Sequence, residues 1–275
     1  ELSGTRQSHW LERLQLEHDN MRSALDWSDR STENAEAGLR LSGFLAEFWI
    51  TRGYLREGWD RLFRALERTQ ASERVDLRSK ALIGISALAY RQSDYPSTRK
   101  FAEQALALFK SSGDKLGIAL VFDRLGNVAT EEGDYENAPK LFEEALALRH
   151  ELNDTRGMAS SFINLGWAAL RPGNYMLANT RLEQALELFQ KLGDDEGIAM
   201  ALSGLSEAAV RGGDLGKASQ LIETSLTIRK ELGDKWGIGV SYGTWAWIAM
   251  RQSDWKTASE RLRESATIRK EIGDK

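Results

Sequence analysis

The side chains that could catalyse acid–base reactions or bind a metal are few in this chain of 275 residues. It contains three histidines, His9, His18 and His150, and no cysteine. A helix that binds zinc places two histidines four residues apart, whereas His9 and His18 are nine residues apart on one predicted helix. We therefore expect all three histidines to be solvated surface residues, and we predict no metal site.

Acidic residues are abundant, with 41 aspartates and glutamates, but they do not form a recognisable catalytic group. They recur at equivalent places along the chain, which is typical of helix caps and of ion pairs between residues four positions apart. No nucleophile, base and orienting group have a common reason to meet, and the phosphate-binding sequence G-x-x-x-x-G-K-[ST] is absent. We predict a protein that has no catalytic residues and no cofactor and is not an enzyme.

Two short phrases recur along the chain at a fixed interval of 40 residues. Glycine or asparagine followed by aspartate stands at 113–114, 153–154, 193–194, 233–234 and 273–274, and variants of "GDY" begin at 93, 133, 173, 213 and 253. Each phrase reads as the end of one helix and the start of the next, because glycine suits the left-handed position after a helix and aspartate caps the following one. A fixed interval of this size is typical of repeat arrays, so we predict a solenoid.

The residues between these phrases have the apolar spacing of helices, with small residues where two helices would cross. The small residues are Gly126, Gly166, Ser206 and Ala246 in the first helix of each pair, and Ala138, Ala178, Ala218 and Ala258 in the second. This pattern resembles the tetratricopeptide repeat (TPR), in a variant of 40 residues without the usual proline at the end of the second helix. The resemblance implies an all-α fold, a right-handed α-solenoid of about six helical hairpins preceded by an N-terminal helix.

We divide the chain into an N-terminal helix at 1–32, which would link to a missing upstream domain, and a TPR-like superhelical array at 33–275. One irregularity is Pro139, which lies inside a helix expected to begin at Asp134, and we predict a local distortion there because proline removes a backbone donor. The repeats are expected at about 33–72, 73–112, 113–152, 153–192, 193–232 and 233–272.

The N-terminal segment is expected to form one long helix with a buried apolar stripe at Trp10, Leu14, Met21, Leu25 and Trp27. It resembles the helix W-x-x-x-L-x-x-E-x-D-N-x-x-x-A-L-x-W that precedes the repeats in bacterial STAND-class regulators, signal-transducing ATPases related to AfsR-like and LuxR-like transcription factors. In that family the repeats form a C-terminal sensor arm that binds an inducer or a partner protein and controls an upstream nucleotide switch. The matching residues are Trp10, Leu14, Glu17, Asp19, Asn20, Ala24, Leu25 and Trp27.

The TPR resemblance also implies a ligand groove lined by the first helix of each pair. Asn127 lies where peptide-binding relatives often place an asparagine that holds the ligand backbone, whereas the family's clamp for a C-terminal carboxylate is not matched. The groove residues carried over by repeat position are Tyr90, Arg91, Asp123, Asn127, Glu131, Ile163, Trp167, Arg171, Glu207, Arg211, Trp247 and Arg251.

Two features of these groove residues leave alternatives open. Four arginines, at 91, 171, 211 and 251, share one repeat position and could receive an acidic peptide or phosphate groups. Alternatively, they stabilise helix C-termini and pair with neighbouring carboxylates. Trp167 and Trp247 either face a ligand in the groove or are buried against the next repeat.

These observations favour a binding protein over an enzyme. The net charge of −4 and an isoelectric point near 5.6 argue against direct nucleic-acid binding, and no run of about 18 apolar residues could span a membrane. We expect a cytoplasmic protein that binds a protein or peptide ligand, or a small inducer, as the sensor arm of a larger STAND-type ATPase or transcriptional regulator. The alternative is a free-standing TPR scaffold or adaptor that binds a peptide or helix in its groove.

The C-terminal end of the array shows no capping helix, although repeat arrays normally need one. The final residues "EIGDK" read as the opening of a seventh unit. We therefore expect that further repeats have been removed, or that the protein self-associates through its uncapped C-terminal repeat.

Overall fold

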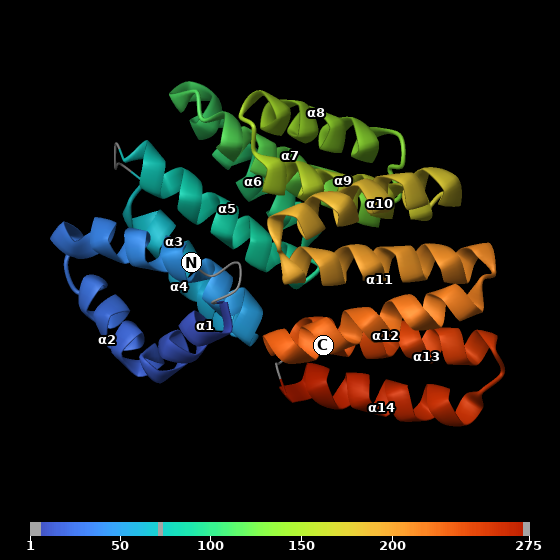
Figure 1. The fold of residues 1–275 in the computed structure, drawn as a ribbon. Coiled ribbons are helices and arrows are strands. Elements are labelled where there is room, and N and C mark those ends of the chain that lie inside the picture. The colour runs from blue at the N-terminus through green and yellow to red at the C-terminus, as the bar shows by residue number, and fades with distance from the viewer. Residues whose placement is uncertain (1–6, 71–73, 272–275) are drawn as a thin grey trace. The chain divides into compact units, whose positions relative to one another are not determined.

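The computed structural model describes residues 7–70 and 74–271, and within these ranges every regular element is a helix (Figure 1). The predicted all-α fold is therefore confirmed for this part of the chain. The elements are α1 (Gln7–Leu16), α2 (His18–Ser28), the 3₁₀ helix η1 (Thr32–Asn34), α3 (Ala35–Arg52), α4 (Leu55–Arg68), α5 (Val75–Arg91), α6 (Tyr95–Ser112), α7 (Lys115–Glu131), α8 (Asn137–Glu151), α9 (Thr155–Leu170), α10 (Tyr175–Leu192), α11 (Asp195–Gly212), α12 (Leu215–Leu232), α13 (Lys235–Arg251) and α14 (Trp255–Glu271).

From α3 onward the helices form six consecutive pairs, as the repeat spacing predicts. We call the first helix of each pair helix A and the second helix B. Each helix A packs against its own helix B, and α5, α7, α11 and α13 also pack against the helix B that precedes them. The chain divides into two compact units, an N-terminal unit of residues 9–152 and a C-terminal unit of residues 153–275.

The turns between repeats have the chemistry that the recurring phrases predict. Gly113 ends α6 in the left-handed conformation, with φ of 71°, and the carboxylate of Asp114 accepts a hydrogen bond of 2.9 Å from the amide of Gly117. The same geometry recurs at Gly193 and Gly233. Three turns use other residues at positive φ, at some cost in backbone strain, namely Ser93, Asn153 and Ser253.

The start of α8 confirms the distortion predicted at Pro139. By repeat position α8 should begin at residue 135, because α6 begins at Tyr95 and α10 at Tyr175, but it begins two residues later, at Asn137. Pro139 is therefore the third residue of the helix, within the first turn, where backbone amides have no partner in the helix. The late start removes the lost hydrogen bond that a helix beginning at 135 would suffer.

The prediction of one long N-terminal helix is wrong, because α1 and α2 are separate helices with a break at Glu17. Most of the predicted stripe is nevertheless found on both sides of the break, since Leu14 on α1 and Met21 on α2 are partly buried against the core cluster that contains Leu25. Leu25 is buried as expected, but Trp27 is 54% exposed, and Leu11, which was not predicted, is buried instead. Trp27 lies two positions after Leu25 on the same helix, and residues two positions apart do not share a helix face.

The expectation that His18 is solvated is also wrong. Its ring is buried between the rings of Tyr54 and Phe48, with centroid distances of 4.4 and 5.2 Å, and its Nε2 lies 3.6 Å from Glu57 Oε1. Burial lowers the pKa of His18 because removal from water disfavours the charged imidazolium, and the positive charge of Arg22 acts in the same direction. His9 is exposed, as predicted.

We expect the folded N-terminal unit to lose stability as the pH falls through the pKa of His18 in the unfolded chain, about 6.5. Because the folded-state pKa lies below that value, the neutral ring contributes its full stability above it and loses it progressively on acidification. The carboxylates of Glu57 and Asp19 raise this pKa and so reduce the effect. Thermal unfolding followed by circular dichroism at pH 7.5 and 5.5 measures it.

The control variants compare the two N-terminal histidines. His18→Gln should flatten the dependence of the melting temperature on pH between these values, whereas His9→Gln, at an exposed position, should leave it as in the wild type. An equal pH dependence in all three proteins would show that burial of His18 does not govern the acid sensitivity.

One position of helix B, buried in four repeats and half-buried at Arg269, holds either phenylalanine or arginine, and the facing position of helix A changes with it. Phe189 and Ile163 pack in one apolar cluster in the C-terminal unit. In the N-terminal unit the equivalent residues form an ion pair, in which the buried guanidinium of Arg149 donates a hydrogen bond to Asp123. Across the array the helix B residues are Phe109, Arg149, Phe189, Arg229 and Arg269, opposite Ile83, Asp123, Ile163, Ser203 and Gly243.

Candidate ligand-binding site

In the N-terminal unit, α7 presents Leu120, Arg124 and Asn127 on one face, because residues four and seven positions apart share a side of a helix. The helix α5 packs beside α7 and presents Ile83 and Tyr90 in the same way, seven positions apart. We call these five residues the N-terminal A-face. Only Tyr90 and Asn127 of them were predicted as groove residues.

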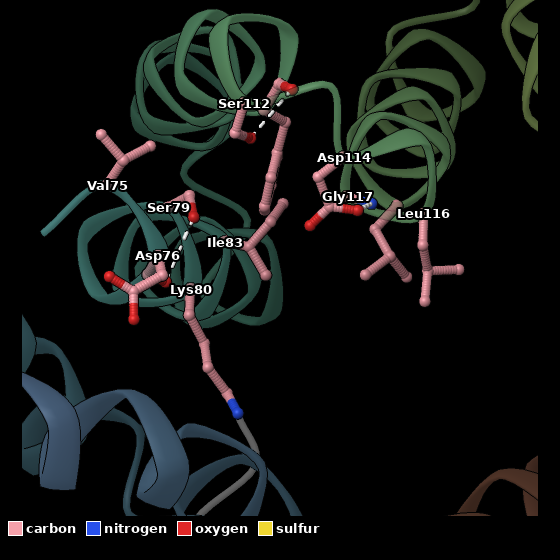
Figure 2. A pocket seen from close by; sticks show the side chains of 11 residues that line it. Val75, Asp76, Ser79, Lys80, Ile83, Ser112, Asp114, Leu116 and Gly117 are labelled. Carbon is pink, nitrogen blue, oxygen red and sulfur yellow. Dashed lines mark hydrogen bonds between the residues drawn. The ribbon is translucent and has the colours of Figure 1, made fainter.

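A pocket of about 700 Å³ opens at the end of this face where α5 and α7 begin (Figure 2). Its walls include the apolar side chains of Ile83, Leu116 and Leu120, and the two leucines are 45% and 43% exposed although each is large and apolar. In Figure 2, Ile83 and Leu116 come from different helices on the two sides of the pocket. The lining residues are Val75, Asp76, Ser79, Lys80, Ile83, Phe109, Ser112, Asp114, Leu116, Gly117 and Leu120.

Lys80 extends from α5 away from Leu116, as Figure 2 shows, and its ammonium nitrogen lies 3.5 Å from the centroid of the Phe44 ring. Burial lowers the pKa of Lys80. Lys80, Leu116 and Leu120 were not predicted as site residues from the sequence. The sequence could have indicated the two leucines, because Leu116 and Leu120 lie eleven and seven residues before Asn127 and so continue the helix face on which Asn127 lies.

At the other end of the N-terminal A-face, the guanidinium carbon of Arg124 lies 5.4 Å from the centroid of the Tyr90 ring. Burial raises the pKa of the Tyr90 hydroxyl, and the negative charge of Glu131 adds to the effect. Burial lowers the pKa of Arg124, whose Nε is shielded from solvent and has no hydrogen-bond partner. Arg124 forms no ion pair with any carboxylate in the described part of the chain.

The other predicted groove residues of this unit have different surroundings. Asp123 is largely buried and is bound by Arg149 inside the hairpin, so it serves the repeat rather than an open surface. Asn127 is half-buried, and its side-chain amide has no hydrogen-bond partner among residues 7–70 and 74–271. Arg91 and Glu131 are exposed.

In the C-terminal unit, the A helices α9, α11 and α13 bring together Trp167, Glu207, Arg211 and Trp247, which we call the C-terminal A-face. Arg211 donates two hydrogen bonds to Oε1 of Glu207, at 3.0 Å from Nε and 2.7 Å from Nη2. Its guanidinium carbon lies 5.3 Å from the centroid of the Trp247 ring. Both tryptophans are half-buried against the repeat cores, so each keeps part of its ring open.

Ile163 was predicted to line the groove, but the structure places it in the core, 5% exposed, with Leu182 and Phe189. In this repeat the side chain packs against helix B of the same pair and is buried there, unlike Ile83 at the equivalent position, which is half-buried and lines the pocket. A ligand on the helix surface cannot reach it, so Ile163 is removed from the candidate site.

The predicted arginine row is divided between the units, with Arg91 in the N-terminal unit and the other three in the C-terminal unit. Arg211 pairs with Glu207, which is the alternative of pairing with a neighbouring carboxylate. Arg171 and Arg251 lie exposed at the ends of α9 and α13, where a positive charge favourably meets the helix dipole.

Among the described residues, no three histidine, aspartate or glutamate side chains come together in a way that could hold a metal ion. Within the same residues, none of the helices combines the length and the apolar character that crossing a membrane requires.

At the C-terminal end, Leu262 on α14 is 47% exposed, whereas the equivalent Leu182 and Ile222 are fully buried. In each compact unit such a residue is covered by the helices around it, so α14 presents an apolar side chain that the described repeats leave open. Self-association through this surface stays a prediction.

Comparison with known proteins identifies the repeat. A family model described as "Tetratricopeptide repeat" matches residues 76–149, 115–191 and 157–231, which together span more than half of the chain. No curated protein sequence matches the chain significantly.

Three solved structures illustrate the likeness of the fold. A Rap protein complexed with Competence and Sporulation Factor has a TM-score of 0.70 over 88% of this chain and 77% of that chain, at 13% identity. The Rap conjugation gene regulator of the plasmid pLS20, in complex with the Phr* peptide, has a TM-score of 0.72 over 95% and 72%, at 13% identity. A STAND protein with a tetratricopeptide repeat sensor from Pyrococcus horikoshii has a TM-score of 0.62 over 99% of this chain but 41% of that chain, at 16% identity.

Proposed function

Because the chain belongs to the tetratricopeptide repeat family, we propose that it is a non-catalytic module that binds a protein or peptide on the exposed faces of its A helices. The two Rap structures are complexes with Competence and Sporulation Factor and with the Phr* peptide, respectively, on the same type of fold. This likeness supports a ligand of peptide character, and the residues of the two A-faces supply the chemistry to hold it.

One observation carries the proposal: a single repeat position of helix A is half-buried in four consecutive repeats and holds chemically different side chains. The adjacent position, by contrast, is small and fully packed in all four, at Gly126, Gly166, Ser206 and Ala246. A position that serves folding alone would keep one kind of side chain, as the adjacent position does. The variable, half-buried residues are Asn127, Trp167, Glu207 and Trp247.

We further propose that this module is the sensor arm of a larger STAND-type signalling ATPase or transcriptional regulator. Nearly the whole chain, 99% of it, aligns with 41% of the STAND protein with a tetratricopeptide repeat sensor. The sequence of α1 and α2 supports the same assignment. A free-standing adaptor is the second candidate, and the match to most of the length of the Rap chains favours it.

The binding role is tested by replacing both tryptophans of the C-terminal A-face, Trp167→Ala with Trp247→Ala. Peptides are first selected from a random displayed library on the wild-type chain, and their affinities are then measured by fluorescence anisotropy. For peptides bound at this face we expect the double variant to weaken binding by about 100-fold, because buried aromatic anchors contribute about 2 kcal/mol or more to interfaces. Trp255→Ala is the matched control, since Trp255 is 67% exposed at the start of a B helix.

Unchanged affinity in the double variant for every selected peptide, with helicity retained, would remove the C-terminal A-face from the proposed site. The sensor role is tested on the full reading frame. If an upstream ATPase domain is encoded, its nucleotide turnover should change on addition of a selected peptide. A frame without such a domain contradicts the sensor role and leaves the adaptor.

A further inference from the structure

We propose that the N-terminal A-face binds an extended peptide segment that carries an apolar side chain and an acidic side chain two positions apart. The apolar side chain would enter the pocket at Ile83, Leu116 and Leu120, and the carboxylate would bind Arg124. This inference deepens the proposed function and rests on it, since it names the class of peptide and the residues that select it.

The pocket accounts for the apolar half of this motif. Its leucines expose about half of their surface although a monomeric protein usually covers large apolar side chains that lie together, and two helices contribute to one concavity. A concave apolar site with few polar groups at its edge is the usual form of a binding pocket. Insertion of one aliphatic or aromatic side chain would remove Leu116 and Leu120 from water.

Arg124 accounts for the acidic half. Other buried arginines of the array have an anionic partner, since Arg149 binds Asp123 and Arg229 lies 3.4 Å from Asp234. Arg124 is half-buried, its guanidinium lies over the face of Tyr90, and no carboxylate among the described residues forms an ion pair with it; its Nε lacks a hydrogen bond, as do the Nε atoms of Arg149 and Arg229. A buried donor without a partner is costly, so a carboxylate that accepts from this guanidinium would satisfy it with a charge-assisted bond.

The charges around Arg124 leave room for a ligand carboxylate. Two carboxylates influence its charge, those of Asp123 and Glu47, but neither forms an ion pair with it in the described part of the chain. Asp123 is already bound by Arg149. Glu47 on α3 opposes an incoming anion, and Arg91 favours it. One turn beyond Arg124, the unbonded amide of Asn127 can donate to and accept from the ligand backbone.

The spacing of the motif follows from helix and strand geometry. Leu120 and Arg124 are one helical turn apart on the same face, a rise of about 6 Å. In an extended peptide, side chains two positions apart point to the same side and are separated by about 6.6 Å. An apolar residue at one position and an aspartate or glutamate two positions away therefore match the pocket and the guanidinium together.

The first test selects random displayed heptapeptides separately on the wild-type chain and on Arg124→Gln. The expected result is an acidic residue two positions from an apolar residue in peptides selected on the wild type, and loss of the acidic preference on the variant. For one synthetic wild-type-selected peptide, Arg124→Gln should weaken binding about 10- to 100-fold, and Glu47→Gln should strengthen it. Arg56→Gln, at an exposed position on α4, is the matched control.

The outcomes separate this inference from the proposed function. Peptides that are enriched without an acidic preference, or with the same preference on Arg124→Gln, overturn the inference but keep peptide binding. No enrichment of any peptide contradicts peptide binding itself and the inference with it.

A second test needs no peptide and reads Arg124 directly. The arginine Nε–Hε nuclear magnetic resonance signals of the folded chain are followed during titration with N-acetyl-aspartate N-methylamide, and Arg124→Gln identifies the signal of Arg124 by its absence. We expect that signal to shift saturably with a dissociation constant on the order of 1 mM, as a fragment of this size allows. The matching asparagine compound should not shift it. Equal shifts with both compounds, or none, would refute the carboxylate site.

Discussion

Asp123→Ala is expected to destabilise the N-terminal unit by about 3 to 5 kcal/mol, because it removes one partner of a buried ion pair while the guanidinium of Arg149 stays buried. The side chain of Arg149 is 4% exposed and that of Asp123 is 13% exposed, so water cannot replace the lost carboxylate without opening the hairpin. Hydrogen–deuterium exchange of the α7 and α8 amides measures the change, since it reports the free energy of local opening.

The repeat array itself supplies the rescue for this variant. The next repeat holds an isoleucine and a phenylalanine at the same two positions, Ile163 and Phe189, packed in one apolar cluster. The double variant Asp123→Ile with Arg149→Phe should therefore be roughly neutral or stabilising by about 1 kcal/mol, since apolar replacements of buried ion pairs often are. If the double variant is as unstable as Asp123→Ala, an isoleucine–phenylalanine pair cannot replace the aspartate–arginine pair in this repeat.

Gly197→Ala is the second substitution with a large expected effect, a destabilisation of about 1 to 2 kcal/mol in the C-terminal unit. A methyl group at this position would overlap the ring of Phe189, which is 1% exposed and has no free space to move into. Alanine gains up to about 1 kcal/mol over glycine in a helix, and overpacking of a core costs about 1 to 3 kcal/mol, so the clash prevails. Chemical denaturation with amide exchange of α10 and α11 measures the difference.

A matched control lies in the same helix. Gly212 is the last residue of α11, exposed, and a methyl group there would meet no atom within 4 Å. Gly212→Ala should stabilise the unit by about 0.5 to 1 kcal/mol through the lost flexibility of the unfolded chain. In a Phe189→Leu background, Gly197→Ala should cost less than in the wild type. An equal cost in both backgrounds would show that the ring of Phe189 is not the obstacle.

The helices and turns were predictable from the sequence because their signals are local. Gly113 and Asp114 form a phrase that returns every 40 residues. The glycine specifies a left-handed helix end and the aspartate caps the next helix, without any contribution from distant contacts. Even the irregular start of α8 followed from Pro139, since proline restricts the residues around it directly.

Burial that depends on distant residues was not predictable in the same way. His18 appeared to be one polar residue on a helix, but the rings that bury it, Phe48 and Tyr54, belong to segments 30 or more residues away. The break at Glu17 turns α2 so that His18 meets those rings. No proline or glycine near this position signals the break in the sequence.

Carrying residues over by repeat position predicted part of the candidate site but not all of it. Register placed Trp167, Glu207 and Trp247 on half-buried A-face positions, but it also placed Ile163 there, which is core. A signal existed for Ile163, because the residues opposite that position change with it between phenylalanine and arginine. Arg124 was missed because arginine stands at this repeat position only once.

The glycine against which Phe189 packs has equivalents at the start of every helix A from α7 to α13, at Gly117, Gly157, Gly197 and Gly237. Phe109 packs against Gly117 and Arg229 against Gly237, so the space left by the glycine is occupied by a ring in one repeat and by a guanidinium in another. Because this contact between repeats accommodates different side chains, it is compatible with the duplication, deletion or exchange of a whole 40-residue unit by recombination. The array is thus compatible with growth or shortening by whole repeats, while the residues of the A-faces vary from one repeat to the next.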